Sequence, residues 1–451
     1  MSILIIGGGD IGATLARRLA SERKDVVLIE SDIERVAQLR ELADVQVVHG
    51  NGSNPAVLRS AGLEEAEMII AVTDSDEINI VSCMVASRET VIPTKIARVR
   101  DPDLAQAVPA IFGDDPLDLN INPEEEAAQI VLRTLRVPGA VRVFDFAEGR
   151  VQVVAFALDG PSEVVGVQLY DFKTRLGIDC NVVAILRDNK MIIPEGKTHI
   201  RGGDQLYAAG SPEALSKLAE VLGKPDVDVR RIVISGGGNI GYYLARMLEA
   251  ENIVPKIIEA DPQRCKYLAE RLEQSVILQG TGTDPELLRE ESIATTDAFL
   301  ALTRDEEDNI LASLLAKRSG AGRVMALVNK VSYAGLVSHI GIDAVVSPHL
   351  AAVSAILHFI RKGKVVAVTS VGEEDGEALE IIALETSELV GKPLRDADFE
   401  DAIVGAIVRG DEVRIPDGDD VIEVGDHVVI FALKSAIPRL ERQMTVQLRY
   451  F

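Results

Sequence analysis

The chain contains no tryptophan, and aromatic residues make up only 4% of its 451 residues. Hydrophobic residues nevertheless reach 47%, so the cores must be built from valine, isoleucine, leucine and alanine, a composition typical of buried parallel sheets covered by helices. No apolar run approaches the roughly 20 residues that a membrane-spanning helix needs, and the N-terminus enters a strand-like segment at once, without a signal peptide. We therefore expect a soluble, cytoplasmic α/β protein.

Cysteine is also scarce, which bears on redox and metal chemistry. The three cysteines, Cys83, Cys180 and Cys265, lie far apart and form no CxxC motif. This usage predicts a reducing compartment and no zinc site. The six histidines show no paired spacing typical of a metal-binding helix, and we assign them no role; they are His49, His199, His339, His349, His358 and His427.

Positive charge is in short supply, because 47 lysines and arginines face 71 aspartates and glutamates, for a formal net charge of -24. A nucleic-acid backbone or an anionic membrane surface would repel such a chain. The balance therefore argues against nucleic acid as a partner and favours high solubility. The length allows about two to four domains, each with its own core.

The chain contains one glycine-rich motif that occurs twice. GGGDIG at residues 7–12 returns as GGGNIG at residues 236–241, and each copy follows a short apolar strand and opens a helix-like stretch, 11–20 or 240–250. In such a strand-loop-helix unit the glycines permit a tight turn, close approach of a pyrophosphate and close helix packing. The helix N-terminus also attracts phosphate. The motif predicts a dinucleotide-binding fold in each half.

An acidic residue stands at the end of the next strand in both halves. Glu30 ends the segment VVLIE, and Glu259 ends PKIIE. A carboxylate at this point accepts hydrogen bonds from ribose hydroxyls and repels a 2'-phosphate. NAD(H) or another unphosphorylated adenosine ligand is therefore favoured over NADP(H). The alternative is a pair of Rossmann-shaped folds that bind nothing.

The repeat extends well beyond the glycine loop. GNGSNP at 50–55 matches GTGTDP at 280–285, and AVTDSDEIN at 71–79 matches ALTRDEEDN at 301–309. Short apolar segments separated by helix-like stretches predict a doubly wound parallel sheet in each half, with strands in the first half near residues 3, 26, 45, 68 and 95. The repeated loops would lie at the carboxyl ends of the strands, where such sheets bind ligands.

A second kind of module ends each half. A helix is predicted over 123–135 and again over 348–361, with proline at its start. The chain then becomes rich in valine and isoleucine with period-two alternation, and AILRDNKMIIPEG at 184–196 recurs as AIVRGDEVRIPDG at 406–418. The polar turns RDNK and RGDE between alternating segments predict hairpins. This module is expected to be a small α+β domain.

The predicted fold class is thus α/β, with two Rossmann-like, doubly wound parallel sheets, each followed by a small α+β C-terminal domain, in tandem duplication. The predicted domains are the first nucleotide-binding domain at 1–120, the first C-terminal domain at 140–223, the second nucleotide-binding domain at 230–347 and the second C-terminal domain at 365–446.

In their order these motifs resemble the regulator-of-potassium-conductance (RCK) family, in a duplicated form, over residues 1–437. The resemblance implies a regulatory protein that is not an enzyme. It would form a homo-oligomer, with a tetrameric ring as the expected form, beneath a membrane-embedded Trk-type potassium channel subunit. This partner would hold it peripherally on the inner face of the cell membrane. Binding of NAD(H), or of ATP or ADP at the same sites, would gate potassium uptake.

The resemblance also implies ligand contacts. In the first half these are the phosphate loop, the ribose-binding acid, two residues on the nicotinamide side and a basic residue that meets phosphate: Gly7, Gly8, Gly9, Asp10, Ile11, Gly12, Glu30, Thr73, Asp74 and Arg98. Their counterparts in the second half are Gly236, Gly237, Gly238, Asn239, Ile240, Gly241, Glu259, Thr303 and Arg304. The counterpart of Arg98 falls on Leu327 or Val328, neither of which pairs with phosphate. We therefore expect the second site to bind more weakly or to bind a different nucleotide.

Other charges near these loops have alternative explanations. Asp76 and Glu77, and the acidic run at 305–308, would suit a cation, but carboxylates at a helix N-terminus more often cap the helix and face solvent. Lys95, Arg98 and Arg100 would also be explained as charges on the edge of a strand.

The competing functional class is an NAD-dependent oxidoreductase. Hydride transfer calls for a positioned acid or base, usually histidine or lysine backed by a carboxylate. His199 and His427 lie in the two C-terminal modules at positions that do not align, whereas a duplicated enzyme would keep its catalytic groups in both halves. A regulator of a different potassium channel or efflux system, or a free-standing nucleotide buffer, also fits the motifs.

Overall fold

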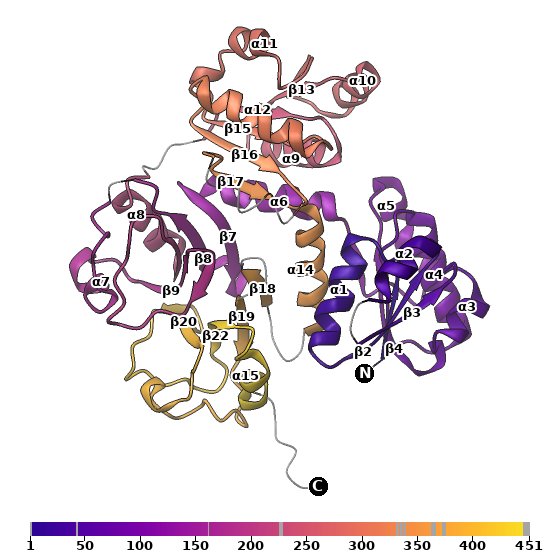
Figure 1. The fold of residues 1–451 in the computed structure, drawn as a ribbon, viewed down its shortest axis with the longest axis horizontal. Coiled ribbons are helices and arrows are strands. Elements are labelled where there is room, and N and C mark those ends of the chain that lie inside the picture. Colours follow the sequence, from indigo (N-terminus) through magenta and orange to yellow (C-terminus); the bar gives the residue numbers. More distant parts are fainter. Residues whose placement is uncertain are drawn as a thin grey trace. The chain divides into compact units, whose positions relative to one another are not determined.

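The computed structural model describes residues 2–41, 44–160, 162–224, 229–330, 333, 337, 340–361, 367–371 and 376–444. His339 lies outside this part of the chain. The chain divides into two compact units (Figure 1). The first comprises Met1–Glu126 and Pro348–Ile360, and the second comprises Ala127–Ser347 and Arg361–Phe451. None of the described helices is long and apolar enough to cross a membrane.

The first unit is built on a six-stranded parallel sheet with the order β3-β2-β1-β4-β5-β6. Its strands are β1 Ser2–Ile6, β2 Asp25–Glu30, β3 Val45–His49, β4 Ala66–Ala71, β5 Thr94–Arg98 and β6 Leu119–Ile121. The helices between them are α1 Asp10–Ser21, α2 Ile33–Leu39, α3 Pro55–Ser60, α4 Asp76–Glu89 and α5 Pro102–Phe112. The strand order reverses between β1 and β4, and ligands of open α/β sheets bind at this kind of switch point.

The second unit repeats this sheet with the order β14-β13-β12-β15-β16-β17. Its strands are β12 Ile232–Ser235, β13 Lys256–Glu259, β14 Val276–Gln279, β15 Ala298–Ala301, β16 Arg323–Leu327 and β17 Ala344–Val346. Its helices include α9 Asn239–Ala250, α10 Pro262–Arg271, α11 Pro285–Glu290 and α12 Glu306–Arg318. The two predicted doubly wound sheets are confirmed, and each has a sixth strand that the sequence analysis did not include. At three residues, β6 and β17 are too short to show a periodic pattern.

Two long helices cross between the halves. They are α6, Pro123–Arg136, and α14, Pro348–Arg361. Ala352 and Ile356 of α14 are fully buried in the core of the first sheet, and the helix lies beside α1 (Figure 1). Ala128 and Val131 of α6 are fully buried in the core of the second sheet. Each sheet is therefore covered by a helix that belongs, in chain order, to the other half.

Two antiparallel sheets form the C-terminal modules, with the orders β10-β9-β11-β8-β7 and β18-β19-β22-β20-β21. The elements of the first are β7 Ala140–Phe146, β8 Val151–Ala157, α7 Leu169–Leu176, β9 Cys180–Arg187, β10 Lys190–Ile192, β11 Gln205–Gly210 and α8 Pro212–Val221. Those of the second are β18 Ala367–Val371, β19 Gly376–Ile382, β20 Ala402–Arg409, β21 Glu412–Arg414, β22 His427–Leu433 and α15 Ile437–Met444. The predicted hairpins are confirmed, since β9 pairs with β10 and β20 with β21.

The two antiparallel sheets face one another across a shared apolar cluster. The rings of Tyr207 and Phe431 lie 6.0 Å apart in it. At its margin Asn181 Nδ2 donates to the carbonyl of Val404 at 3.1 Å. The two modules were predicted from the sequence, but their association was not. The expected period-two alternation is wrong for the central strands β8, β9, β11, β20 and β22. They are buried on both faces and are therefore nearly continuous hydrophobic runs.

One glycine of the first loop is expected to contribute strongly to the stability of the fold. A Cβ atom at Gly12 would lie 1.9 Å from the carbonyl oxygen of Gly7, so α1 could not remain against β1. We expect Gly12→Ala to lower the free energy of unfolding by about 3 kcal/mol, measured by calorimetric melting. Gly9→Ala is the matched control, because no atom lies within 4 Å of a Cβ there. Equal melting temperatures for the two variants would contradict this packing.

Candidate nucleotide-binding site

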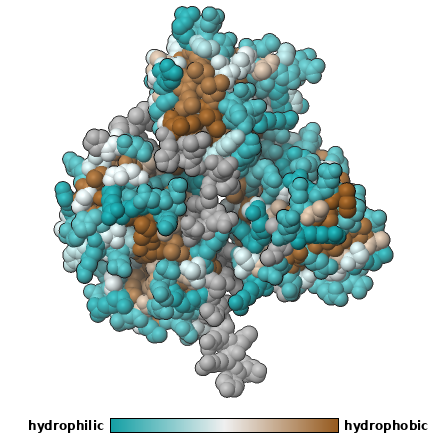
Figure 2. Space-filling view, in the orientation of Figure 1, coloured by the Kyte–Doolittle hydropathy of each residue, from teal (hydrophilic) through white to brown (hydrophobic). Residues whose placement is uncertain are grey.

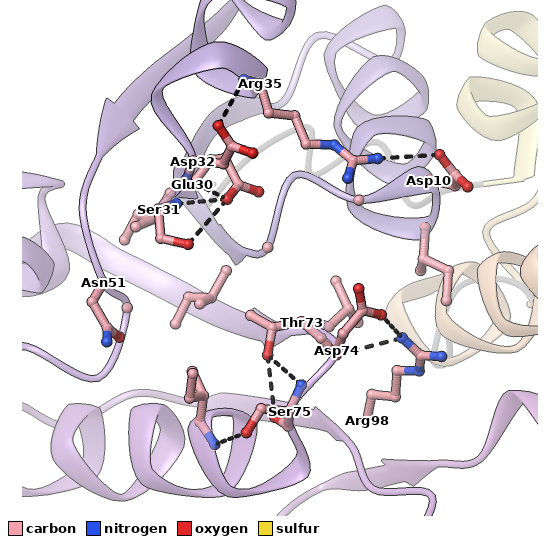
Figure 3. A pocket seen from close by; sticks show the side chains of 18 of the residues that line it. Asp10, Glu30, Ser31, Asp32, Arg35, Asn51, Thr73, Asp74, Ser75 and Arg98 are labelled. Carbon is pink, nitrogen blue, oxygen red and sulfur yellow. Dashed lines mark hydrogen bonds and ion pairs between the residues drawn. The ribbon is translucent and has the colours of Figure 1, made fainter.

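A cleft with a volume of about 580 Å³ opens over the carboxyl ends of the strands in the first unit (Figure 3). This volume is in the range of small-ligand and cofactor sites. The lining residues are Ile6, Gly7, Gly9, Asp10, Ile11, Ile29, Glu30, Ser31, Asp32, Arg35, Gly50, Asn51, Gly52, Val72, Thr73, Asp74, Ser75, Ile78, Arg98 and His349. Among the predicted first-half residues, Gly8 and Gly12 support the loop and the rest line the cleft.

Glu30 ties the glycine loop to the loop after β2. Its carboxylate accepts hydrogen bonds from the backbone N–H groups of Gly8 at 2.7 Å, Ser31 at 2.6 Å and Asp32 at 2.9 Å. Glu30 is 9% exposed. A carboxylate oxygen has more than one lone pair, so a ribose hydroxyl at the mouth of the cleft has an acceptor as well. The predicted ribose acid thus also shapes the loop.

The loop after β4 is held by Asn79, a residue the sequence analysis did not single out. The side-chain oxygen of Asn79 accepts from Thr73 N at 2.8 Å and Thr73 Oγ1 at 2.7 Å. Its Nδ2 donates to the carbonyls of Thr73 at 3.1 Å and Arg98 at 2.9 Å. Asn79 is fully buried. Its recurrence as the last residue of ALTRDEEDN, Asn309, was the available signal.

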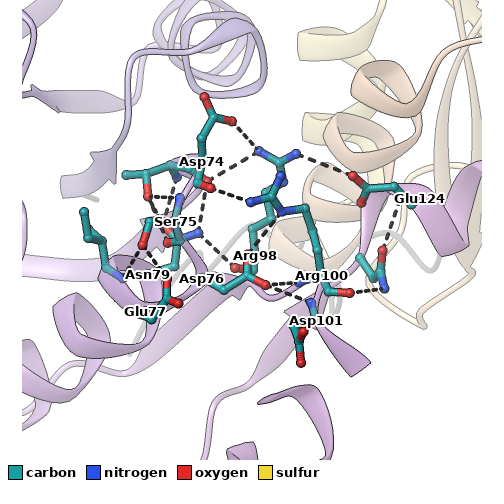
Figure 4. Close-up of polar contacts among 12 residues, drawn as sticks. Asp74, Ser75, Asp76, Glu77, Asn79, Arg98, Arg100, Asp101 and Glu124 are labelled. Carbon is teal, nitrogen blue, oxygen red and sulfur yellow. Dashed lines mark hydrogen bonds and ion pairs between the residues drawn. The ribbon is translucent and has the colours of Figure 1, made fainter. Parts of the chain in front are cut away.

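Arg98 brings a buried positive charge to the cleft (Figure 4). It is 7% exposed, and its Nη1 donates to Asp74 Oδ1 at 3.1 Å and to the carbonyl of Thr73 at 3.4 Å. Its Nη2 lies 3.9 Å from Glu124 Oε1. Among the described residues its Nε has no hydrogen-bond partner. A buried guanidinium with an unused donor fits a phosphate-bearing ligand.

For Lys95 and Arg98 the alternative explanation as strand-edge charges is wrong, because β5 lies between β4 and β6. Lys95 is buried and pairs with Asp115, and Arg100 Nε pairs with Asp76 at 3.1 Å. Asp76 was expected to face solvent, but it is only 6% exposed. It also accepts from the backbone N–H of Arg100 at 2.8 Å, and so fixes the loop after β5.

For metal binding the geometry offers no support. Within the part of the chain that the structure describes, no three His, Cys, Asp or Glu side chains come together in a way that could hold an ion. Asp305, from the acidic run of the second half, accepts from the N–H of Asp308 at 2.8 Å and caps α12. Asp305 therefore caps a helix, as the alternative explanation of the acidic run proposed.

Arg35 and His349 are among the lining residues of the cleft that were not predicted from the sequence. Arg35 Nη2 donates to Asp10 Oδ1 at 3.4 Å (Figure 3), and its recurrence in the repeat, as Arg264, was the available signal. His349 Nδ1 lies 3.6 Å from Asp10 Oδ2. Burial lowers the pKa of His349, although Asp10 opposes the shift. No pattern pointed to His349, because it belongs to α14 and enters the first unit from the second half.

Comparison with known proteins agrees with this architecture. The model of the TrkA-N domain matches residues 3–114 and 232–348, and that of the TrkA-C domain matches residues 153–223 and 378–445. The chain is 40% identical to the Trk system potassium uptake protein TrkA of Halomonas elongata, with 100% of both chains covered. It is 36% identical to that of Haemophilus influenzae, with 98% of both covered. The chain belongs to the TrkA family.

Among solved structures, the TrkA-family chain is similar to the GsuK channel, with a TM-score of 0.60 and 19% identity over 98% of this chain and 78% of that one. It is also similar to the GsuK channel bound to NAD, with a TM-score of 0.59 and 18% identity over the same shares. These likenesses show the fold. The duplicated fold class predicted from the motifs is confirmed.

In the second half of this TrkA-family chain, the same loops are present with different charges. Glu259 accepts from Gly237 N at 2.7 Å, as Glu30 does from Gly8. Arg264 Nε donates to the carbonyl of Gly237 at 2.7 Å. Asn309 Nδ2 donates to the carbonyl of Leu327 at 3.0 Å, which identifies Leu327 as the counterpart of Arg98. The sequence-based expectation of a weaker or different second site stays a prediction.

Proposed function

We propose that this TrkA-family chain is the nucleotide-sensing regulatory subunit of a Trk-type potassium uptake system, and that it gates a membrane-embedded channel subunit on binding NAD(H) or adenine nucleotides. The observation that carries the proposal is the cleft at the first switch point. There the N-terminus of α1, the carboxylate of Glu30 and the buried guanidinium of Arg98 converge. Curated relatives of full length are named Trk system potassium uptake proteins.

Each part of a dinucleotide has a matching group in the cleft. The loop from Gly7 to Gly12 and the positive end of α1 would hold the pyrophosphate. Glu30 would accept the ribose hydroxyls and repel a 2'-phosphate, while Thr73 and Asp74 would face the nicotinamide side. ATP or ADP would use the same adenosine and phosphate positions. The residues Gly236 to Gly241, Glu259, Thr303 and Arg304 would do so in the second half.

The proposal treats the chain as a regulator without catalysis. His349 beside Asp10 is a histidine-carboxylate pair in the cleft, but Asn239 stands where the second half would need the carboxylate. His199 and His427 lie in the C-terminal modules and do not line the cleft. A duplicated enzyme would keep such a pair in both halves. The alternative within the same class is regulation of another potassium channel or efflux system.

Gating requires that the nucleotide bind one state of the assembly more tightly than the other. A ratio of about 100 between the two affinities supplies about 2.7 kcal/mol per site. Four chains in a ring would present about eight nucleotide-binding domains. The ring would sit on the cytoplasmic side, peripheral to the membrane through its partner. Nucleotide-dependent movement of neighbouring modules would then reach the channel.

The test is calorimetric titration of the full chain with NADH, NAD, ATP and NADPH. We expect NADH to bind about 100-fold more tightly than NADPH, because a 2'-phosphate would meet the Glu30 carboxylate. Glu30→Ala and Glu259→Ala separate the two sites, and Glu34→Ala, an exposed acid of α2, is the control. Nucleotide-dependent potassium flux through vesicles that hold the Trk membrane subunit tests gating. Absence of binding by all four nucleotides would refute the proposal.

A further inference from the structure

The helix that covers the first sheet brings a residue of the second half to the candidate ligand. His349 stands in the first turn of α14, next to Pro348, and lines the first cleft together with Arg98. Arg98 reaches the same cleft from the end of β5. The two side chains therefore meet one ligand space from segments about 250 residues apart in sequence.

Arg98 and His349 each lie against the carboxylate of an exposed side chain. The side chain of Arg98 is 9% exposed, whereas that of its partner Asp74 is 95% exposed. The side chain of His349 is 32% exposed, whereas that of Asp10 is 69% exposed, and their 3.6 Å separation exceeds a normal hydrogen bond. Buried side chains are fixed by their surroundings, while exposed ones exchange rotamers quickly. An incoming anion can therefore replace Asp74 and Asp10, while Glu124, whose side chain is 19% exposed, stays 3.9 Å from Arg98 Nη2.

Two further observations point to an anion at this place. Arg98 Nε has no hydrogen-bond partner among the described residues, and the Arg98 side chain is more than nine-tenths buried. The first N–H groups of α14, a helix of 14 residues, begin at the position of His349, and a helix N-terminus favours negative charge. The charged groups that surround His349 are Asp10, Asp74, Arg98 and Glu124.

We infer that Arg98, His349 and the N-terminus of α14 form an anion subsite in the first cleft, which takes the terminal phosphate of ADP or ATP. The inference rests on the proposed nucleotide site and deepens it. A nucleoside di- or triphosphate would then touch both halves of the chain, through α1 and through α14. The second half lacks the equivalent side chains, because Leu327 replaces Arg98 and the residue that matches His349 is Glu124. The subsite is specific to the first half.

Titration of the full chain tests this in a Gly238→Leu background, which leaves only the first site able to bind. We expect His349→Ala to weaken ATP and ADP binding about tenfold, because a hydrogen bond to a charged group is lost, while AMP and NADH bind as in the parent. His349→Gln keeps a donor and should retain most of the ATP affinity. His199→Ala, an exposed histidine of the first C-terminal module, is the matched control.

The dependence on pH separates this role from simple packing. Burial keeps the pKa of free His349 low, and a bound phosphate would favour its protonated form. ATP affinity of the parent should therefore rise as the pH falls from about 8 to about 6, and His349→Gln should remove that part of the rise. Unchanged ATP affinity in His349→Ala, or an equal loss for ATP, AMP and NADH, would overturn the inference. If the parent binds no nucleotide, the proposed function itself fails.

Discussion

Replacing Gly9 with leucine is expected to abolish nucleotide binding at the first site and to leave the fold intact. Gly9 is the N-cap of α1, with φ -62° and ψ -175°, a backbone conformation open to any residue. No atom lies within 4 Å of a Cβ built there, and the residue lines the cleft. A leucine side chain would therefore occupy the space of the pyrophosphate instead of clashing with the protein.

The expected loss of NADH affinity is at least about 100-fold, because phosphate contacts to the loop and to the helix N-terminus are lost together. Calorimetric titration measures this loss, and a melting curve shows that the protein is folded. Gly238→Leu is the matched variant in the second half, where the glycine also has open space around it. An unchanged NADH affinity in the Gly9→Leu, Gly238→Leu double variant would mean that the ligand binds elsewhere.

The second large effect is expected at Asn79. Its replacement by alanine leaves buried backbone groups of Thr73 and Arg98 without partners. Each such group costs about 1 to 3 kcal/mol, so we expect Asn79→Ala to lower the free energy of unfolding by about 3 kcal/mol or more. The loop that carries Thr73 and Asp74 would also lose its anchor, and nucleotide binding should weaken.

Denaturation and titration of the same samples measure both effects. Asn79→Asp keeps the acceptor that Thr73 uses but loses the donor to Arg98, so it should fall between the parent and Asn79→Ala. Asn309→Ala should reproduce the loss of stability in the second half, because Asn309 makes the matching contacts to Thr303 and Leu327. If the Asn79→Ala variant is as stable as the parent and binds nucleotide normally, the hydrogen bonds of Asn79 are not needed to hold the loop after β4.

Local patterns predicted much of this fold. The glycine loops, Glu30 and Glu259, and the hairpin turns depend on a few neighbouring residues, so the sequence was enough to find them. The short strands β6 and β17 were missed because three residues show no period. The exchange of α6 and α14 was missed because an amphipathic helix shows that it has a partner but not which sheet that partner is.

The site divides in the same way. Gly7, Glu30 and Thr73 follow adjacent strands, whose carboxyl ends must meet at the switch point. Arg35 and Asn79 act through contacts across the fold, and only the duplication, which repeats them as Arg264 and Asn309, marks them in the sequence. His349 does not recur in the other half, so the duplication does not point to it. Its place in the cleft depends on the crossing of a helix over more than 200 residues of chain.

The crossed helices also have a consequence for any division of the gene into two. A gene divided between the two halves would encode two polypeptides, each without the helix that covers its own sheet. Each product would carry the helix that the other needs, since Ile356 belongs to the core of the first sheet and Val131 to that of the second. Gene fission would therefore create two proteins that depend on each other for folding. In the fused chain both covering helices, α6 and α14, are part of one polypeptide. They are therefore always made in equal amounts.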